Sequence, residues 1–169
     1  MTTIFPVLVK CPNCESVFKS TTLGSYGHAS VDECGCRRFW GLNPMPFFIR
    51  ICPNCEFIDW NSSFSTDRSS RPEGLSREQR KDCTLFMSFG QKLEERGEIK
   101  QAIIVYFNAG CCYRVEHKEE FRFAFQEAIR LLEQILESEG DVDMQGIKAS
   151  FLLNRLKNCT SEEKLSSKL

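Results

Sequence analysis

The sequence predicts an α+β fold, with a small cysteine-rich β domain in residues 1–60 and an all-α domain in residues 76–157. The tetrapeptide Cys-Pro-Asn-Cys occurs twice in the first part, each time after a short apolar run, whereas apolar residues recur at helical spacing through the second part. Residues 61–75 are Ser-rich and broken by Pro and Gly, which predicts a linker. Residues 158–169 are expected to form a polar tail.

The first domain is expected to contain two β-hairpins that face each other. One apolar run, residues 7–10, leads into the first tetrapeptide, and another, residues 47–51, leads into the second. Apolar residues after each tetrapeptide, at positions 17–18 and 57–60, supply the returning strands. Each tetrapeptide therefore lies in the turn of a hairpin.

The two turns predict a metal site. A C-x2-C turn directs two sulfurs at one ion, and two such turns complete the tetrahedron that zinc prefers. The predicted ligands are Cys11, Cys14, Cys52 and Cys55. Iron in a four-sulfur site uses the same ligands, so it is the alternative metal. Four thiolates leave no position for water, so we expect a structural, zinc-ribbon-like site rather than a catalytic one.

A third pair, Cys34 and Cys36, lies between the two turns with Gly35 between them. These residues are candidates for additional metal ligands or for a redox pair, and otherwise they are free thiols in a loop, which is the reading we adopt from sequence. The remaining cysteines fall in or beside helical segments and are expected to be packed thiols. The histidines, His28 and His117, are expected at surface or turn positions.

Composition limits the function classes. Apolar residues make up 41% and charged residues 27% of the 169 residues, the net charge is -1, and no apolar run is long enough for a membrane span. The N-terminus has no basic segment typical of a secretory signal, so we expect a cytoplasmic protein without membrane contact. In a reducing compartment, ten cysteines indicate metal ligands and buried thiols.

Four helices are expected in the second domain. The first spans about 77–96, with Ser76 as its N-cap and Gly97 as its C-terminal left-handed residue. The second, third and fourth span about 98–114, 118–138 and 143–157. The fourth is expected to cover the last apolar face of the stack.

The first two helices resemble a tetratricopeptide repeat that starts at Cys83. Bulky and small residues occupy the positions expected for that family, although Arg114 stands where a Pro often ends the repeat. The matching residues are Phe86, Phe89, Gly90, Leu93, Gly97, Ile99, Ala102, Tyr106 and Ala109. The resemblance implies a helical array, and a plain helical bundle is the alternative.

The whole chain resembles the bacterial family known as domain of unknown function twenty-two twenty-five. The resemblance is carried by the two Cys-Pro-Asn-Cys turns, the segment Asn43-Pro44 and Ile51, followed by the tetratricopeptide-like helices. That family usually has Gly after each second Cys, whereas this chain has Glu15 and Glu56 there. Gly at that position eases a left-handed backbone turn. The family name implies no activity.

These features predict a non-catalytic adaptor, in which a structural zinc domain supports helices that bind a protein or peptide partner. A nucleic-acid-binding ribbon is an alternative, with Arg37, Arg38 and Trp40 as its contacts, but the near-neutral charge disfavours it. An iron or thiol redox protein is a further alternative. No nucleophile motif or Gly-rich phosphate loop predicts an enzyme. The terminal Ser167-Lys168-Leu169 matches a peroxisomal address, which we interpret as coincidence.

Overall fold

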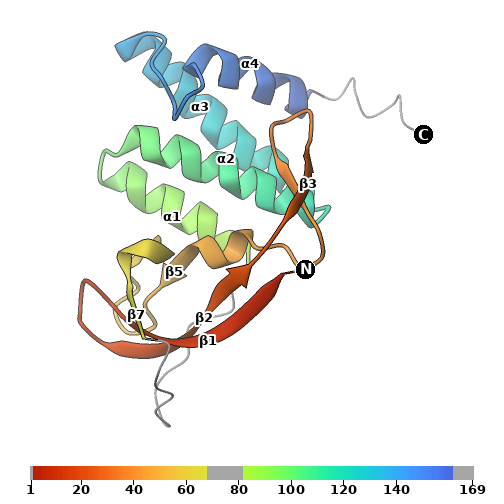
Figure 1. Cartoon of the computed structure of the whole chain (residues 1–169). Coiled ribbons are helices and arrows are strands. Elements are labelled where there is room, and N and C mark those ends of the chain that lie inside the picture. Colours follow the sequence, from red (N-terminus) through yellow and green to blue (C-terminus); the bar gives the residue numbers. More distant parts are fainter. Residues whose placement is uncertain (1, 68–81, 162–169) are drawn as a thin grey trace. The chain divides into compact units, whose positions relative to one another are not determined.

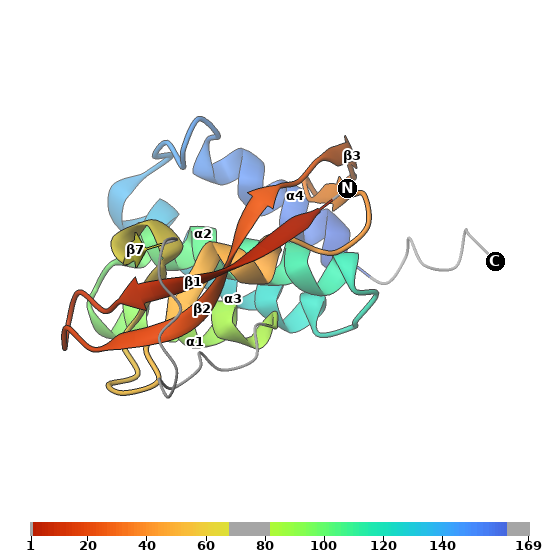
Figure 2. The same cartoon turned by 60° about the horizontal axis from the view of Figure 1, so that its bottom comes forward.

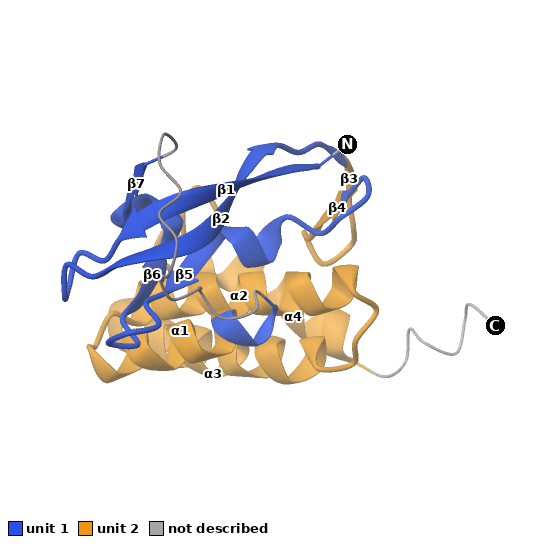
Figure 3. Ribbon diagram, turned by 90° about the horizontal axis from the view of Figure 1, so that it is seen from below, with its two compact units in different colours: residues 1–28, 39–85 blue, residues 29–38, 86–169 orange. Residues whose placement is uncertain are grey.

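The structure is a computed structural model that describes residues 2–67 and 82–161. It has the mixed α+β composition that the sequence predicts, with small antiparallel sheets in the N-terminal half and four helices in the C-terminal half. Two compact units are present: unit 1 comprises residues 1–28 and 39–85, and unit 2 comprises residues 29–38 and 86–169 (Figure 3). Residues 29–38, which the sequence analysis places in the first domain, thus cluster with the helices.

Two hairpins carry the Cys-Pro-Asn-Cys turns, as the apolar runs predict. In the first, β1 (Thr3–Lys10) pairs with β2 (Val17–Ser25), and Lys10 lies opposite Val17 next to the turn (Figure 1). In the second, β5 (Ile49–Ile51) pairs with β6 (Ile58–Trp60) (Figure 3). A 3-10 helix, η1 (Met45–Phe48), directly precedes β5.

The segment after β6 belongs to unit 1, although its polar composition predicts a linker. A short 3-10 helix, η2 (Asn61–Ser63), is followed by β7 (Ser65–Asp67), which pairs antiparallel with β1. The resulting sheet has the order β2-β1-β7, with β1 in the middle (Figure 2). Phe64 between η2 and β7 is buried, so this aromatic residue anchors the segment to the core.

The core of unit 1 includes cysteines of the two Cys-Pro-Asn-Cys turns. Val7 and Val9 point into it from alternate positions of β1, as the period of a strand requires. Phe18 and Phe64 meet edge to face, with ring centroids 6.2 Å apart. Cys11 and Cys52 are buried in the same cluster. The sulfur site therefore shares one core with the sheet that presents it.

The four expected helices are present, with shifted ends. They are α1 (Thr84–Glu95), α2 (Ile99–Val115), α3 (Phe121–Glu139) and α4 (Ala149–Thr160). Ser76, the expected N-cap of the first helix, lies outside the described residues, as do residues 162–169 with the terminal Ser-Lys-Leu. The described start of α1 is capped by Asp82, whose Oδ1 accepts hydrogen bonds from the backbone N–H and the hydroxyl of Thr84.

The fourth helix starts six residues later than the apolar pattern predicts. Met144 is buried, but it belongs to a turn in which its N–H donates to Ile147 O (2.7 Å) and Gly146 has a positive φ of 88°. Asp143 and Lys148 form an isolated β-bridge that closes this turn. Asp141 then accepts hydrogen bonds from the N–H and hydroxyl of Ser150, which fixes the first turn of α4.

Glycines allow close helix contacts in unit 2. A Cβ at Gly90 of α1 would lie 2.5 Å from Cε1 of the buried Tyr106 of α2. A Cβ at Gly110 of α2 would lie 2.2 Å from Cε1 of Phe125 of α3. The predicted turn at Gly97 is confirmed, since Gly97 has a φ of 75° and Glu98 N–H donates to Leu93 O (2.9 Å).

A hairpin of β3 (His28–Val31) and β4 (Arg37–Phe39) contains the loop with Cys34 and Cys36. Its strands are exposed along almost their whole length, so the hairpin has little apolar core of its own. Among the described residues, no helix combines the length and the apolar character needed to cross a membrane.

Candidate metal centre

The two Cys-Pro-Asn-Cys turns have the same backbone geometry. In each, the N–H of the residue after the second Cys donates to the carbonyl of the first Cys, at 3.0 Å for Glu15 and 2.9 Å for Glu56. The N–H of the first Cys donates five residues onward, to Ser16 O (2.9 Å) or Phe57 O (2.8 Å). The repeated tetrapeptide in the sequence is therefore a repeated local structure.

Glu15 and Glu56 both adopt the left-handed conformation, with φ of 61° and 56°. The family usually has Gly at these two positions, and Gly there favours this conformation. A side chain with a Cβ is strained there, because the Cβ approaches the following carbonyl oxygen. The two turns thus keep the backbone of a glycine-containing turn without its glycines.

The four predicted ligands lie together. The Sγ atoms of Cys11, Cys14, Cys52 and Cys55 are all within 4.8 Å of one another. Cys11 Sγ lies 3.7 Å from Cys55 Sγ, and Cys14 Sγ lies 3.7 Å from Cys52 Sγ. An ion at the usual Zn–S distance of about 2.3 Å would have sulfurs about 3.8 Å apart at the corners of a tetrahedron. These two sulfur pairs therefore have the separation of metal ligands.

Polar groups around the sulfurs connect the two turns. Asn13 Nδ2 donates to Cys55 Sγ (3.5 Å), and Asn54 Nδ2 donates to Cys14 Sγ (3.6 Å), so each turn's asparagine contacts a sulfur of the other turn. The Ser16 hydroxyl lies 3.0 Å from Cys14 Sγ and 3.3 Å from Cys52 Sγ. Such contacts orient ligands and stabilise thiolate charge.

The ionisation of the thiols differs within the cluster. Burial raises the pKa of Cys11 to about 12, although backbone N–H groups of its own turn act in the opposite direction. Hydrogen bonds from Ser16, and then from Asn54, lower the pKa of Cys14 to about 5. The pKa of Cys52 is also lowered, because hydrogen bonds from Ser16 and the backbone of its turn outweigh its burial. Cys14 is thus a thiolate at neutral pH before any metal binds.

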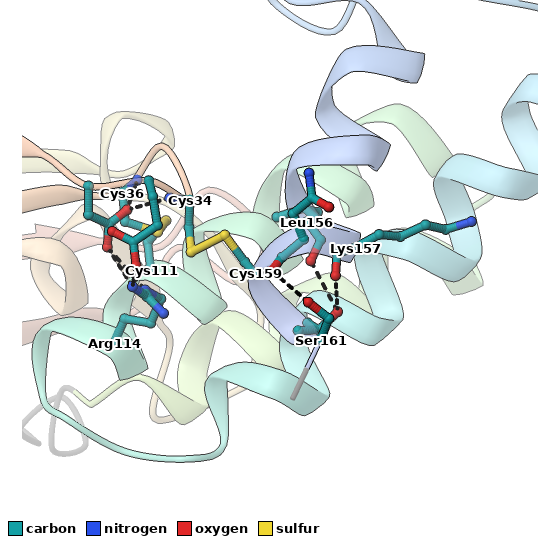
Figure 4. Close-up of a disulfide and its surroundings, with 12 residues drawn as sticks. Cys34, Cys36, Cys111, Arg114, Leu156, Lys157, Cys159 and Ser161 are labelled. Atoms are coloured by element: carbon teal, nitrogen blue, oxygen red, sulfur yellow. Dashed lines mark hydrogen bonds and ion pairs between the residues drawn. A yellow bond between two sulfur atoms is a disulfide. The ribbon is translucent and has the colours of Figure 1, made fainter. Parts of the chain in front are cut away.

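Cys34 and Cys36 form disulfides within unit 2. Cys34 is bonded to Cys159 of α4, and Cys36 is bonded to Cys111 of α2 (Figure 4). Cys83 and Cys112 are disulfide-bonded as well. The expectation of free loop thiols at 34 and 36, and of packed thiols at 83, 111, 112 and 159, was therefore wrong. Among the described residues, free thiols belong to the four cysteines of the metal cluster.

The residues that sequence suggested for nucleic-acid binding are accessible. Arg37 and Arg38 are exposed at the start of β4, and Trp40 after that strand is 64% exposed. Arg50 of β5, in contrast, is fully buried and donates from Nη2 to Thr21 O (3.2 Å). His28 and His117 are exposed, as expected, and His117 ends α2 with a φ of 56°.

Two groups of functional residues were missed from sequence. Ser16 bridges two sulfurs, and its place two residues after Cys14 was the only signal for it. Asp32 organises the loop with Cys34 and Cys36, since its Oδ1 accepts hydrogen bonds from the N–H of both cysteines at 2.9 Å. The short Asp-x-Cys-Gly-Cys spacing is compatible with such a turn but does not reveal which helices the cysteines reach.

Residues 6–96 match the family described as an uncharacterized protein conserved in bacteria (DUF2225). The match covers more than half of the chain and includes both hairpins and the four clustered cysteines, so the chain belongs to this family. No curated protein and no solved structure matches the chain significantly.

Proposed function

We propose that the four clustered cysteines bind one zinc ion and that this zinc holds unit 1 together. The spacing of the sulfurs supports the proposal most directly, because Cys11 with Cys55 and Cys14 with Cys52 are 3.7 Å apart across the two turns. That separation is far longer than the roughly 2.05 Å of a disulfide bond and close to the edge of a zinc–sulfur tetrahedron. Four soft thiolate ligands suit zinc and iron.

The proposed role of the metal is structural rather than catalytic. Four protein ligands leave no open position for water or substrate, and thiolates reduce the Lewis acidity of the ion. Cys11 and Cys52 are buried in the core of unit 1 beside Val9 and Phe18. Metal binding and folding of unit 1 are therefore coupled, since the ion would join the turns of the two hairpins inside this core.

The helices are the proposed partner surface of an adaptor. The contacts Gly90–Tyr106 and Gly110–Phe125 place small residues where successive helices cross, which supports the tetratricopeptide-like reading of α1 to α3. Stacked helical hairpins of this kind present extended faces to peptides or helices of other proteins.

Metal analysis tests the zinc site. The full-length chain, purified from a medium that contains both zinc and iron, should carry about one zinc per chain when measured by mass spectrometry. The Cys52→Ser, Cys55→Ser variant lacks two of the proposed ligands. It should lose the metal, and the backbone amides of unit 1 should lose their protection from hydrogen exchange. A measured content of one iron per chain would show that the bound metal is iron and not zinc. A folded protein without metal would contradict the proposal.

A matched control separates ligand loss from cysteine loss. The Cys36→Ser, Cys111→Ser variant also removes two cysteines, but it removes a disulfide and leaves the sulfur cluster intact. This variant should retain one zinc per chain. Loss of zinc in both double variants would indicate general unfolding rather than a specific site.

A further inference from the structure

The loop of the β3–β4 hairpin is attached to the helices of unit 2. β3 is fully exposed, and β4 is exposed except for Phe39, which is half-buried. Two disulfides join its loop to the helices, one to α2 and one to α4. Arg114 of α2 adds an ion pair, with Nη2 3.0 Å from Asp32 Oδ2. The position of this hairpin therefore depends on covalent and charged contacts more than on apolar packing.

The loop keeps its shape without the disulfides. Asp32 Oδ1 accepts hydrogen bonds from the N–H of Cys34 and Cys36, Asp32 N–H donates to Cys36 O (2.9 Å), and Gly35 N–H donates to Asp32 O (3.0 Å). Gly35 has a φ of 85°, which favours glycine. Because these bonds lie within the loop, both sulfurs stay in place when either disulfide opens.

The two disulfides differ in accessibility. Cys36 and Cys111 are both buried, at 1% and 3% exposed. Cys34 is also buried, but its partner Cys159 is partly exposed in the last turn of α4 (Figure 4). Thiol–disulfide exchange requires an incoming thiolate to reach one sulfur of the bond. The two disulfides should therefore differ in their rate of exchange with an external thiol.

We propose that the Cys34–Cys159 disulfide is a reversible thiol–disulfide exchange site for a dithiol reductant, whereas the Cys36–Cys111 disulfide is a permanent structural bond. One thiolate of the reductant attacks Cys159 Sγ, the bond to Cys34 breaks, and Cys34 leaves as a thiolate that takes up a proton. The second thiolate of the reductant then attacks the mixed disulfide, which releases Cys159 as a thiol. Two electrons pass from the dithiol, which becomes a cyclic disulfide.

Opening this bond removes the covalent attachment of the end of α4, where Arg122 Nη1 still donates to Thr160 O (3.4 Å), while the loop remains attached. The loop is still held by the Cys36–Cys111 disulfide and by the ion pair between Asp32 and Arg114. The first part of α4 stays packed through the buried Leu152 and Leu156. The local consequence falls on the last turn, where Ser161 N–H donates to Lys157 O. A disulfide oxidant restores the bond, because Cys34 stays in its hydrogen-bonded loop and the packed part of α4 keeps Cys159 close to it.

Timed alkylation during reduction tests the order of opening. The full chain is treated with dithiothreitol, quenched with N-ethylmaleimide at intervals and mapped by peptide mass spectrometry, with fragment spectra to distinguish Cys111 from Cys112. Cys34 and Cys159 should be labelled together, at least about tenfold faster than Cys36 and Cys111, because access limits the exchange. Oxidised glutathione should then restore the Cys34–Cys159 pair. Equal rates, the opposite order, or failure to reform the bond would overturn the proposal.

Hydrogen exchange on two variants gives an independent readout. Cys159→Ser cannot form the bond, so its α4 amides near residue 160 should exchange as fast without reductant as those of the reduced wild type. In Cys111→Ser the Cys34–Cys159 bond remains, and its opening rate should stay within about twofold of wild type. If reduction leaves exchange at the end of α4 unchanged in the wild type, the bond does not control this helix. Peptides from the two Cys-Pro-Asn-Cys turns are followed separately, so that a change at the zinc site is not mistaken for a change in α4.

Discussion

At the scale of single residues, two glutamates occupy turn positions that favour glycine. Glu56 has a φ of 56° directly after Cys55, and the side chain is exposed. Replacing Glu56 by Gly should raise the free energy of unfolding by about 0.5–1 kcal/mol, because an L side chain in the left-handed region is strained by about 1–2 kcal/mol and the entropy of glycine offsets part of the gain. Thermal unfolding with zinc in excess measures the change.

Two further variants show whether the backbone is responsible. Glu56→Ala removes the same side chain but retains the Cβ, so its stability should stay near that of the wild type. Glu15→Gly should gain less than Glu56→Gly, because it also removes the ion pair between Lys10 Nζ and Glu15 Oε1 (3.1 Å), which as an exposed pair contributes about 0–1 kcal/mol. A Glu56→Ala variant as stable as Glu56→Gly would show that the charge, not the turn, matters.

The sulfur cluster could be predicted residue by residue, whereas the disulfides could not. Cys11 with Cys14 and Cys52 with Cys55 are neighbours in sequence, so each half of the site is visible as one tetrapeptide. Cys36 pairs with Cys111 over 75 residues, and Cys34 pairs with Cys159 over 125 residues. Sequence alone does not determine the connectivity of distant cysteines. The expectation of a reducing compartment also favoured free thiols over disulfides.

At the scale of elements, the contact between α1 and α2 depends on a residue without a side chain. Gly90→Ala should destabilise the protein by about 1–3 kcal/mol, as overpacking in a core usually does. The added Cβ would lie 2.5 Å from Cε1 of Tyr106, which is only 1% exposed. The ring cannot turn away easily, because Tyr106 donates a hydrogen bond to Glu94 Oε1 (2.6 Å). Urea unfolding monitored by far-ultraviolet circular dichroism measures the loss.

Ser88→Ala is the matched control for Gly90→Ala. Ser88 lies on α1 two residues earlier and is exposed, so Ala there should be neutral or slightly stabilising through its higher helix propensity. If the variant Gly90→Ala were stabilised to the same degree, helix propensity would outweigh packing and the close crossing of α1 and α2 would be refuted.

Elements with strong periodicity were predicted more closely than short polar ones. α2 and α3 differ from the expected ranges by one to three residues, because each carries apolar residues over four or more turns. β7 was missed, since Ser65, Thr66 and Asp67 are exposed and polar and form a strand only by pairing with β1. The start of α4 was misplaced because the buried Met144 fits a helical pattern, although the segment is held as a turn by the Asp143–Lys148 bridge.

At the scale of the whole molecule, the two compact units should respond differently to metal removal. Unit 1 has its sulfur cluster inside its core, whereas unit 2 has the Cys34–Cys159 and Cys36–Cys111 disulfides and a separate apolar core. Chelation at pH 7 should therefore increase amide hydrogen exchange throughout β1, β2, β5 and β6 and leave α2 and α3 protected, because the binding free energy of a structural zinc is also folding free energy. Equal loss of protection in both units would show that they unfold together.

The pH dependence of zinc binding follows from the different thiols. The pKa of Cys14 is lowered to about 5, so this thiol is ionised above that pH in the folded metal-free state. Its contribution to the stability of the folded state is complete above the ordinary thiol pKa near 9 and is lost as the pH falls toward 5. The pKa of Cys11 is raised to about 12, so its contribution to stability has the opposite pH dependence. The protonated thiol stabilises the folded metal-free state below pH 9, and this contribution is lost as the pH rises toward 12.

Zinc must displace the proton of Cys11 at any pH below 12, so zinc affinity should keep rising between pH 7 and 9, by about tenfold per pH unit for each proton released. Competition with a chelator of known affinity at pH 6, 7, 8 and 9 measures this slope. Calorimetric titration in buffers of different ionisation enthalpy counts the released protons directly. An affinity that becomes constant above pH 7 would mean that all four thiols are already ionised before zinc binds, and it would contradict the effect of burial on Cys11.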